Sequence, residues 1–247
     1  MISVNIEHKQ QEFNSAMKRY EQDKAYFYFN KFISIAIIGL QAILIICVAR
    51  SVISCNAHLV ILLMAYVLAD FINGLIHMYM DNNDHYNWIG GPLVANFHLH
   101  HKKILYDKKP LAIVYFNETG SKVWMLPTLL LVVVLAWMHL ISPALVAFFM
   151  YFGIFSSIAE VSHYICHMLN SPWAKLLGDL HILLPKRHHG KHHSADNKNY
   201  AFLNGMTDPL LNIIASKYFL GYKKNTDLHF STYEISKISE INNQERR

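Results

Sequence analysis

"FISIAIIGLQAILIICVARSV", residues 32–52, is an apolar run of the length that crosses a lipid bilayer. A membrane-spanning helix needs about 20 mostly apolar residues. Three further stretches meet this requirement, and they run roughly from His58 to Met80, from Val123 to Leu140 and from Pro143 to His167. The connections after the first and third stretches are only a few residues long. The sequence therefore predicts two antiparallel helical hairpins, that is, an all-α, integral membrane four-helix protein.

The composition of the whole chain agrees with a membrane protein. Of the 247 residues, 53% are hydrophobic and only 16% are charged, and the mean hydropathy is +0.19. The alternative is a soluble protein with four buried helices, but the apolar runs approach membrane length. The three cysteines form no disulfide framework and no CxxC motif. A net charge of +5 can indicate a nucleic-acid partner, but no nucleic-acid-binding motif accompanies the charge, so none is expected.

The basic residues predict which way the chain crosses the membrane. Of the 22 Lys and Arg residues, 21 lie in the N-terminal segment, in the loop from about 80 to 122 or in the tail after 168. Four spans place these three segments on one side, and the positive-inside rule makes that side cytosolic. We expect a polar cytosolic N-terminal segment at 1–31, a membrane domain at 32–220 and a polar tail at 221–247. The N-terminal segment is too polar for a cleavable signal peptide.

Most of the histidines lie on the same predicted cytosolic side as the basic residues. Eleven of the sixteen lie at the cytosolic ends of the second and fourth predicted spans, in the following loop or in the tail. These eleven are His77, His98, His100, His101, His163, His167, His181, His188, His189, His192 and His193. The other five, His8, His58, His85, His139 and His229, lie outside any cluster and are interpreted as ordinary polar residues. The pattern predicts a helical, histidine-rich cytosolic cap.

The spacing of these histidines is typical of metal ligands. Residues four apart stand on one side of a helix, as do His163 and His167, or His77 and Asp81. In "HHGKHH", residues 188–193, no single helix face collects all four rings, because neighbouring residues point about 100° apart. Such a segment suits two metals, or one metal with a supporting network. The alternative is a solvated basic surface that contacts lipid headgroups.

Asp70 lies within the second predicted span, where a charge is costly unless it has a partner. It shares a helix stripe with His77 and Asp81. One interpretation is that its carboxylate orients a ligand histidine. The other is a hydrogen bond between two helices.

The number of ligands indicates the metal centre. About ten imidazoles with one or two carboxylates exceed what a single metal can use. A structural zinc site is not expected, because the sequence has no set of cysteine thiolates to bind it. Imidazole suits iron, zinc, copper and nickel. A dinuclear iron site that activates O2 fits best, since the C–H bonds of a lipid chain offer no group for acid–base attack. We predict these ligands: His77, Asp81, His100, His101, His163, His167, His181, His188, His189, His192 and His193. Asp70 and His98 are predicted to support the ligands or to contact the substrate.

Several motifs in this region resemble those of a known family. They are "ADFINGLIHMYMD" (69–81), "FHLHH" (97–101), "FNETG" (116–120), "SHYICH" (162–167), "DLHILLPKRHHGKHH" (179–193) and "YAFLNGMTDPL" (200–210). Together they resemble the plasmanylethanolamine desaturase family, the Kua/CarF-type lipid desaturases, which includes plant plastid palmitate desaturases. The resemblance covers roughly residues 65–215. The run from 181 to 193 is its most specific part.

The chain departs from the family pattern near the paired histidines. The family usually has Trp where this chain has Met78, glutamate where it has Leu99, and Asp-Pro where it has Lys102-Lys103. His98 is an additional histidine, and the loop after His101 is longer. These departures leave the metal set intact. They concern the substrate, because this loop can cover the lipid entrance.

The resemblance implies an O2-dependent membrane desaturase with two iron ions and a phospholipid substrate. In one branch an alkyl ether becomes the vinyl ether of a plasmalogen, and in the other an acyl chain of a phospholipid is desaturated. Electrons would come from a carrier such as cytochrome b5 or ferredoxin, which the basic cytosolic face could dock. The membrane would be a bacterial inner membrane or the endoplasmic reticulum. Glu118, in the matched "FNETG" stretch, would support the ligands or contact the substrate.

Other functions are compatible with parts of the pattern. A hydroxylase can use the same histidine spacing. A histidine-rich metal transporter would place its ligands near the bilayer midplane, whereas here only Asp70 lies that deep. A haem protein needs one or two axial histidines and leaves the others unexplained. A site-2-type protease needs an HExxH motif, which is absent.

Overall fold

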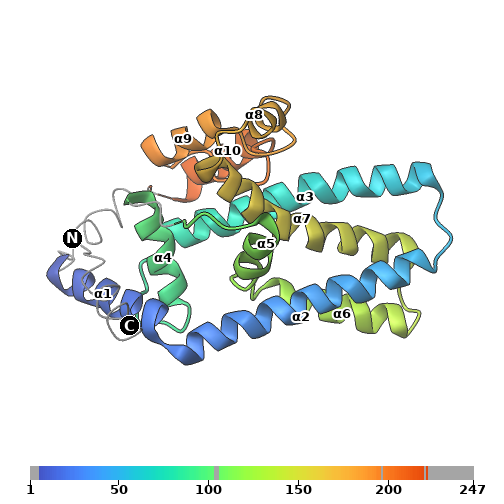
Figure 1. Ribbon diagram of the computed structural model, residues 1–247, viewed down its shortest axis with the longest axis horizontal. Coiled ribbons are helices and arrows are strands. Elements are labelled where there is room, and N and C mark those ends of the chain that lie inside the picture. Colours follow the sequence, from blue (N-terminus) through green and yellow to red (C-terminus); the bar gives the residue numbers. More distant parts are fainter. Residues whose placement is uncertain (1–5, 103–105, 196, 220, 222–247) are drawn as a thin grey trace.

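The computed structural model describes residues 6–102, 106–195, 197–219 and 221, and within them every regular element is an α-helix (Figure 1). The order along the chain is α1 (Ile6–Gln22), α2 (Lys24–Ala49), α3 (Cys55–Asn82), α4 (Gly91–Lys102), α5 (Leu111–Thr119), α6 (Met125–Trp137), α7 (Pro143–Met168), α8 (Pro172–Asp179), α9 (Lys186–Ser194) and α10 (Asp208–Tyr218). The prediction of an all-α fold is therefore confirmed.

Two hairpins form the long body of the molecule, α2 with α3 and α6 with α7 (Figure 1). Their tight connections follow from local capping. Ser54 and Ser142 have extended backbones, and each accepts a hydrogen bond at its side chain from an amide in the first turn of the next helix. Such serine caps satisfy amides that have no partner within a helix. Both hairpin turns lie at the same end of the molecule.

Three helices, α2, α3 and α7, are long and apolar enough to cross a membrane, judged by length and composition. The third predicted span is shorter than expected, because α6 has only 13 residues. It begins after the turn that contains the buried Lys122, and it ends before His139, whose positive φ of 56° cannot continue a right-handed helix. The predicted four-helix count thus corresponds to three long helices and one short apolar helix.

The predicted limit at residue 31 does not coincide with the end of a helix. Helix α2 begins at Lys24, so residue 31 lies inside it. The N-terminal segment forms α1, which packs the buried side chains of Phe13, Ala16 and Met17 against α4. The tail predicted at 221–247 lies, apart from residue 221, outside the described residues.

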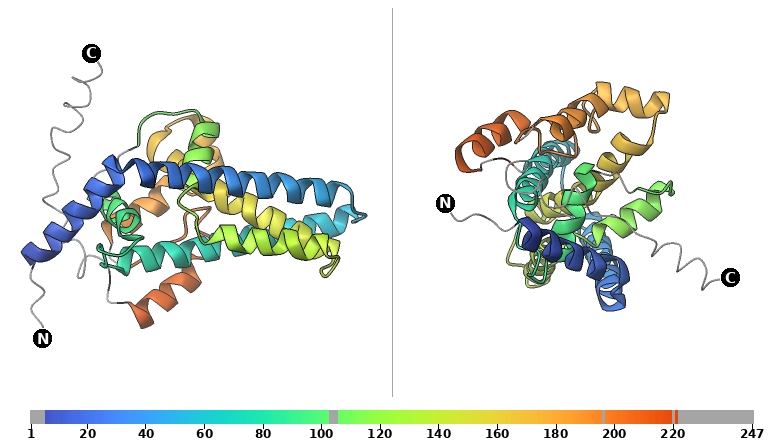
Figure 2. Two further views of the ribbon diagram at one scale, coloured as in Figure 1. Left: turned by 90° about the horizontal axis from the view of Figure 1, so that it is seen from below. Right: turned by 90° about the vertical axis from the view of Figure 1, so that its left-hand side faces the viewer.

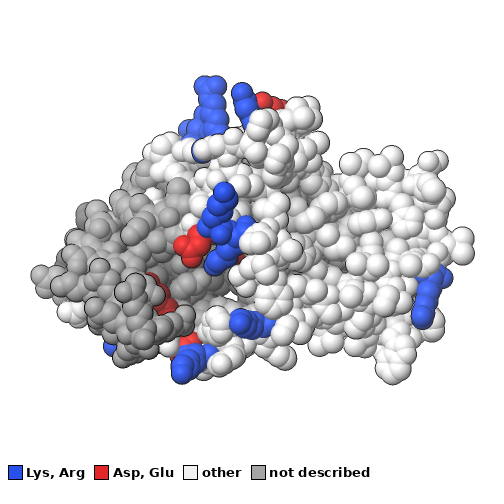
Figure 3. Space-filling view, in the orientation of Figure 1, with Lys and Arg blue, Asp and Glu red and all other residues white. Residues whose placement is uncertain are grey.

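The remaining helices gather around the ends of α3 and α7 that lie away from the hairpin turns (Figure 2). Small buried residues, among them Ala65, Ala69 and Ala159, belong to the core between α3 and α7. Side chains of this size let two helix backbones approach closely. On the face shown in Figure 3, charged side chains are sparse toward the hairpin turns and gather around the middle of the molecule and toward its other end. Charged side chains therefore gather toward one end of the apolar helices.

Candidate metal centre

Among the described residues, nine side chains of metal-binding type converge in two groups at this polar end. The five-histidine group contains His100, His163, His167, His189 and His193, and the carboxylate group contains His77, Asp81, His101 and His192. Within each group the potential ligand atoms all lie within 4.8 Å of one another. The two groups are neighbours, since the ring centroids of His101 and His193 are 5.0 Å apart. The ligands come from α3, α4, α7 and α9, so only the tertiary fold assembles them.

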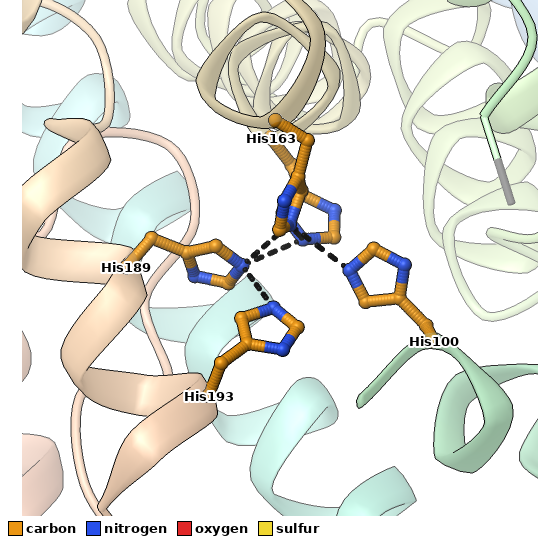
Figure 4. A group of neighbouring side chains, drawn as sticks. His100, His163, His189 and His193 are labelled. Atoms are coloured by element: carbon orange, nitrogen blue, oxygen red, sulfur yellow. Dashed lines mark hydrogen bonds between the residues drawn. The ribbon is translucent and has the colours of Figure 1, made fainter. Parts of the chain in front are cut away.

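The five-histidine group points its Nε2 atoms at one small region (Figure 4). The Nε2 atom of His189 lies 2.9 Å from those of His163 and His167, which are 3.2 Å from each other. The Nε2 atoms of His100 and His193 lie 3.0 Å from those of His167 and His189 respectively. Two nitrogens that each lie about 2.1 Å from one metal at a right angle are about 3.0 Å apart. The spacing therefore fits ligands that share a metal.

Burial keeps these imidazoles neutral. It lowers the pKa of His100 and of His189 well below the ordinary value, and the neighbouring imidazoles lower both further. The same causes lower the pKa of His193 to about 2. A neutral imidazole is the form that donates a lone pair to a metal. The group is thus suited to a cation and does not act as a positively charged surface.

The carboxylate group surrounds the fully buried Asp81. Its Oδ1 atom lies 3.0 Å from Nε2 of His101. Its Oδ2 atom lies 3.4 Å from Nε2 of both His77 and His192. A buried carboxylate needs compensation, and a cation among these four ligands would provide it.

Backbone carbonyls orient two ligands of the carboxylate group. The Nδ1 atom of His77 donates to the carbonyl of Tyr200 at 2.8 Å, and Nδ1 of His192 donates to the carbonyl of Lys198 at 2.7 Å. A carbonyl can only accept, so Nδ1 carries the proton in each ring. A neutral ring then presents the Nε2 lone pair to the group, which is how metal-bound histidines are usually held.

The five-histidine group is held differently. The Nδ1 atom of His163 lies 3.1 Å from the hydroxyl of Tyr106. The Nδ1 atom of His189 is buried and has no hydrogen-bond partner among the described residues. Within the described part of the chain, neither of these two rings donates to a backbone carbonyl. Contacts between the imidazole rings hold the group together.

Two predicted ligands, His181 and His188, lie outside both groups. On α9, His189, His192 and His193 point into the site, whereas Nε2 of His188 lies 2.6 Å from Oδ2 of Asp208. The other oxygen of Asp208 accepts from the amide of Ala201. His181 is exposed in the turn after α8.

Asp70 holds a loop, and its hydrogen bonds to the described residues involve no histidine. Its carboxylate accepts from the amides of Asn204, Gly205 and Thr207 at 3.0, 3.3 and 2.9 Å, and from the hydroxyl of Thr207 at 2.7 Å. Gly205 has a φ of 82°, and a Cβ there would lie 2.8 Å from the ring of His188. Asp70 thus fixes the segment 197–208, which supplies the carbonyls that orient His77 and His192.

His98 also lies outside the two groups. Its Nε2 atom donates to the carbonyl of Met80 at 3.0 Å, and its Nδ1 atom lies 2.6 Å from the hydroxyl of Tyr86. These contacts join α4 to the end of α3 and so help to place His100 and His101, which follow on the same helix.

A cavity of about 430 Å³ reaches both groups. It is lined by His77, His100 and His163, by Glu118 and Glu160, and by the charged residues Glu21, Lys31, Asp107 and Lys109. Burial, with the charge of Glu160 as a second cause, raises the pKa of Glu118 to about 7. The cavity therefore offers charges of both signs beside the ligands.

A buried ion pair that was not predicted from the sequence lies beside this cavity. Nζ of Lys122 lies 2.8 Å from a carboxylate oxygen of Glu160 and donates to the side chain of Asn73 at 2.6 Å. Lys122 and Glu160 are both buried. One sequence signal was available, since Lys122 directly precedes the apolar run that begins at Val123.

Comparison with protein families matches residues 66–219 to the lipid desaturase domain. This range includes all nine side chains of the two groups and ends just after α10. Comparisons with curated proteins and with solved structures gave no match.

Proposed function

The chain belongs to the lipid desaturase domain family and is an oxidoreductase, and from this premise we propose that it is an O2-dependent di-iron membrane desaturase. The observation that carries the proposal is the pair of adjacent ligand groups at one end of three long apolar helices. Two neighbouring groups with eight imidazoles and one carboxylate suit two metal ions, and the absence of thiolates among them favours iron over structural zinc.

In this proposal the nine grouped residues hold two iron ions, which when bound supply the reduction of O2 and the removal of two hydrogens from a lipid chain. The neutral rings of His100, His189 and His193 keep their lone pairs available. The segment 197–208 holds the orientation of His77 and His192. Tyr106, on the cavity side of His163, helps to exclude water from the reacting region.

We propose the alkyl ether chain of a plasmanyl phospholipid as the substrate, with a plasmalogen vinyl ether as the product. The cavity supports a reacting bond close to a lipid headgroup, since charged side chains line the same cavity as His100 and His163. Lys31 and Lys109 suit a phosphate, and Glu21 and Asp107 suit an ammonium group. A phospholipid acyl desaturase or hydroxylase remains the alternative enzyme, and a metal transporter the alternative outside enzymes.

The electrons would enter through the outer face of α9. Lys186, Arg187 and Lys191 are exposed there, whereas His189, His192 and His193 on the same helix point into the two groups. An acidic carrier such as cytochrome b5 or ferredoxin would therefore dock one helix away from the ligands. In the proposed topology α6 is the fourth span, and the basic segments and the active site face the cytosol of a bacterial inner membrane or the endoplasmic reticulum.

The proposal is tested by lipid mass spectrometry of a host that expresses the chain, with and without a supply of alkyl-ether lipid. We expect vinyl-ether phospholipid only when both the chain and the alkyl lipid are present, and about two irons per purified chain. A new acyl double bond or an alcohol would replace the proposed substrate or reaction. An active protein with stoichiometric zinc would overturn the O2-dependent mechanism.

A further inference from the structure

Helix α8 presents three different stripes. Ala174 and Gly178 are buried against the rest of the protein. Trp173, Leu176 and Leu180, at helical spacing, are 45%, 57% and 60% exposed. Lys175 and Asp179, one turn apart, are also exposed. An apolar stripe beside a charged stripe, with a third side already packed on protein, is typical of a helix at a membrane surface.

The position of α8 along the apolar helices supports this reading. Only residues 169–171 separate α8 from α7, and the chain then runs back beside α7 and α3 (Figure 1). In the turn after α8, the carbonyl of Ile182 accepts a hydrogen bond from the hydroxyl of Tyr66. Tyr66 lies about 17 Å along α3 from Cys55, at 1.5 Å per residue. This point falls within the roughly 30 Å that a bilayer's hydrocarbon core occupies.

The backbone of the turn has the hydrogen bonds that such a depth requires. The amides of His181, Ile182 and Leu183 donate to carbonyls of α8. The amide of Leu184 donates to the hydroxyl of Ser162 on α7 at 2.8 Å. Irregular backbone at membrane depth is tolerated only when its polar groups are satisfied by the protein. These four amides meet that condition without water.

We propose that α8 and the turn at residues 180–182 dip into the bilayer leaflet on the side of the metal centre. Trp173, Leu176, Leu180 and Ile182 face acyl chains, and the charged groups of Lys175 and Asp179 point toward the headgroups of the same leaflet. Next to Tyr66, α3 also exposes Leu63 and Val67, at 52% and 41%, so the partner is the same bilayer that the long helices span. The ligand helix α9 follows this element directly, so its anchoring fixes the depth of the metal centre.

Nitroxide spin labels on single cysteines test the proposal in phosphatidylcholine vesicles, after Cys47, Cys55 and Cys166 are replaced by alanine. The labelled variants are Leu176→Cys and Leu180→Cys on the apolar stripe, and Lys175→Cys as the neighbouring control. Leu130→Cys on α6 is the control for lipid exposure, and Lys191→Cys on α9 is the control for water. Collisions with O2, which concentrates in lipid, are compared with collisions with a water-soluble nickel chelate.

We expect the labels at 176 and 180 to favour O2 over nickel several-fold, as at 130, and the labels at 175 and 191 to favour nickel. Nickel access at 176 and 180 like that at 191, with 130 still in lipid, would overturn the proposal and leave the membrane desaturase intact. Nickel access at 130 as well would count against the membrane protein itself. Spin–spin broadening at 176 that disappears on dilution with lipid would show a second copy on this face and also overturn the proposal.

A second measurement does not depend on the cysteine replacements. The native protein is reconstituted with brominated phosphatidylcholine, which quenches tryptophans that touch acyl chains. We expect Trp173→Phe to remove a measurable part of the quenched fluorescence. If the quenched fraction is unchanged by Trp173→Phe, the apolar stripe does not contact lipid.

Discussion

The two ligand groups lie side by side but are built differently. The carboxylate group contains a buried anion, Asp81, and backbone carbonyls fix the rings of His77 and His192. The five-histidine group contains no carboxylate, and its neighbouring Nε2 atoms lie 2.9–3.2 Å apart. One group is therefore oriented from outside, and the other consists of rings that need a common cation between them.

Two metal ions bound in these groups would therefore depend on different parts of the fold. The carboxylate group depends on the segment 197–208, which α3 holds through Asp70. The five-histidine group depends mainly on α4, α7 and α9 meeting at the right distance. Variants that affect one group and spare the other can therefore separate the two.

The largest effect is expected for His189→Ala, because this ring contacts three others in the five-histidine group. We expect lipid desaturation to fall more than 100-fold and iron to fall from about two to one per chain, or lower. Metal analysis of the purified protein and product lipid measure both. His85→Ala, at an exposed histidine outside the groups, should change neither. Full iron content in His189→Ala would contradict the proposed ligand set.

Asp81→Asn tests the carboxylate group in the same way. The amide keeps the size of the side chain but removes its charge, so the cation of this group loses its only anionic ligand. We expect a similar loss of activity, with one iron retained in the five-histidine group. An iron spectrum typical of a single ion would support independent metal binding by the two groups. Retention of two coupled irons would show that Asp81 does not bind metal.

Asp70→Asn tests the carboxylate group indirectly, because none of the hydrogen bonds of Asp70 to the described residues goes to a ligand. A neutral amide cannot accept as well from the three amides at 204–207, so the carbonyls of Lys198 and Tyr200 lose their fixed position. Supporting contacts of this kind are typically worth about 10–100-fold in metal affinity. We expect that loss in the carboxylate group alone, measured by metal titration. Asp179→Asn, at an exposed site, is the control. An equal loss of metal affinity in both groups would indicate a general effect on folding.

A smaller effect is expected for His188→Ala, although His188 belongs to the histidine-rich run. It removes one hydrogen bond to Asp208, which is worth about 1–3 kcal/mol when a buried partner is left unsatisfied. We expect a lower melting temperature with iron content unchanged at about two per chain. Loss of one iron with normal stability would instead make His188 a ligand.

The smallest effect concerns the cavity beside the two groups. The pKa of Glu118 is raised from 4.5 to about 7, so the folded state holds this proton more tightly than the unfolded state. Its contribution therefore lowers stability as pH rises from about 4.5 to 7. We expect Glu118→Gln to melt close to wild type at pH 4.5 and a few degrees higher at pH 8. Melting curves in detergent measure this, and parallel curves for the two proteins would exclude the effect.

The sequence determined the helical class and the polar end of the molecule. Apolar runs of membrane length, with serines before them, produce long helices through local forces, and α3 and α7 begin within a few residues of the predicted positions. The spacing of His163 and His167, and of His77 and Asp81, is a property of a single helix. These side chains therefore point the same way whatever surrounds them, and the sequence could identify them.

Only the tertiary structure decided how the histidines divide. His188 and His189 are neighbours in the chain, yet one meets Asp208 and the other meets His163 and His167. Asp70 could have faced a histidine, but the loop at 204–207 reaches it first, from 134 or more residues away in the chain. Periodicity gives the direction of a side chain on its own helix. It does not give the partner, because the partner comes from a distant segment whose approach depends on the packing of the whole molecule.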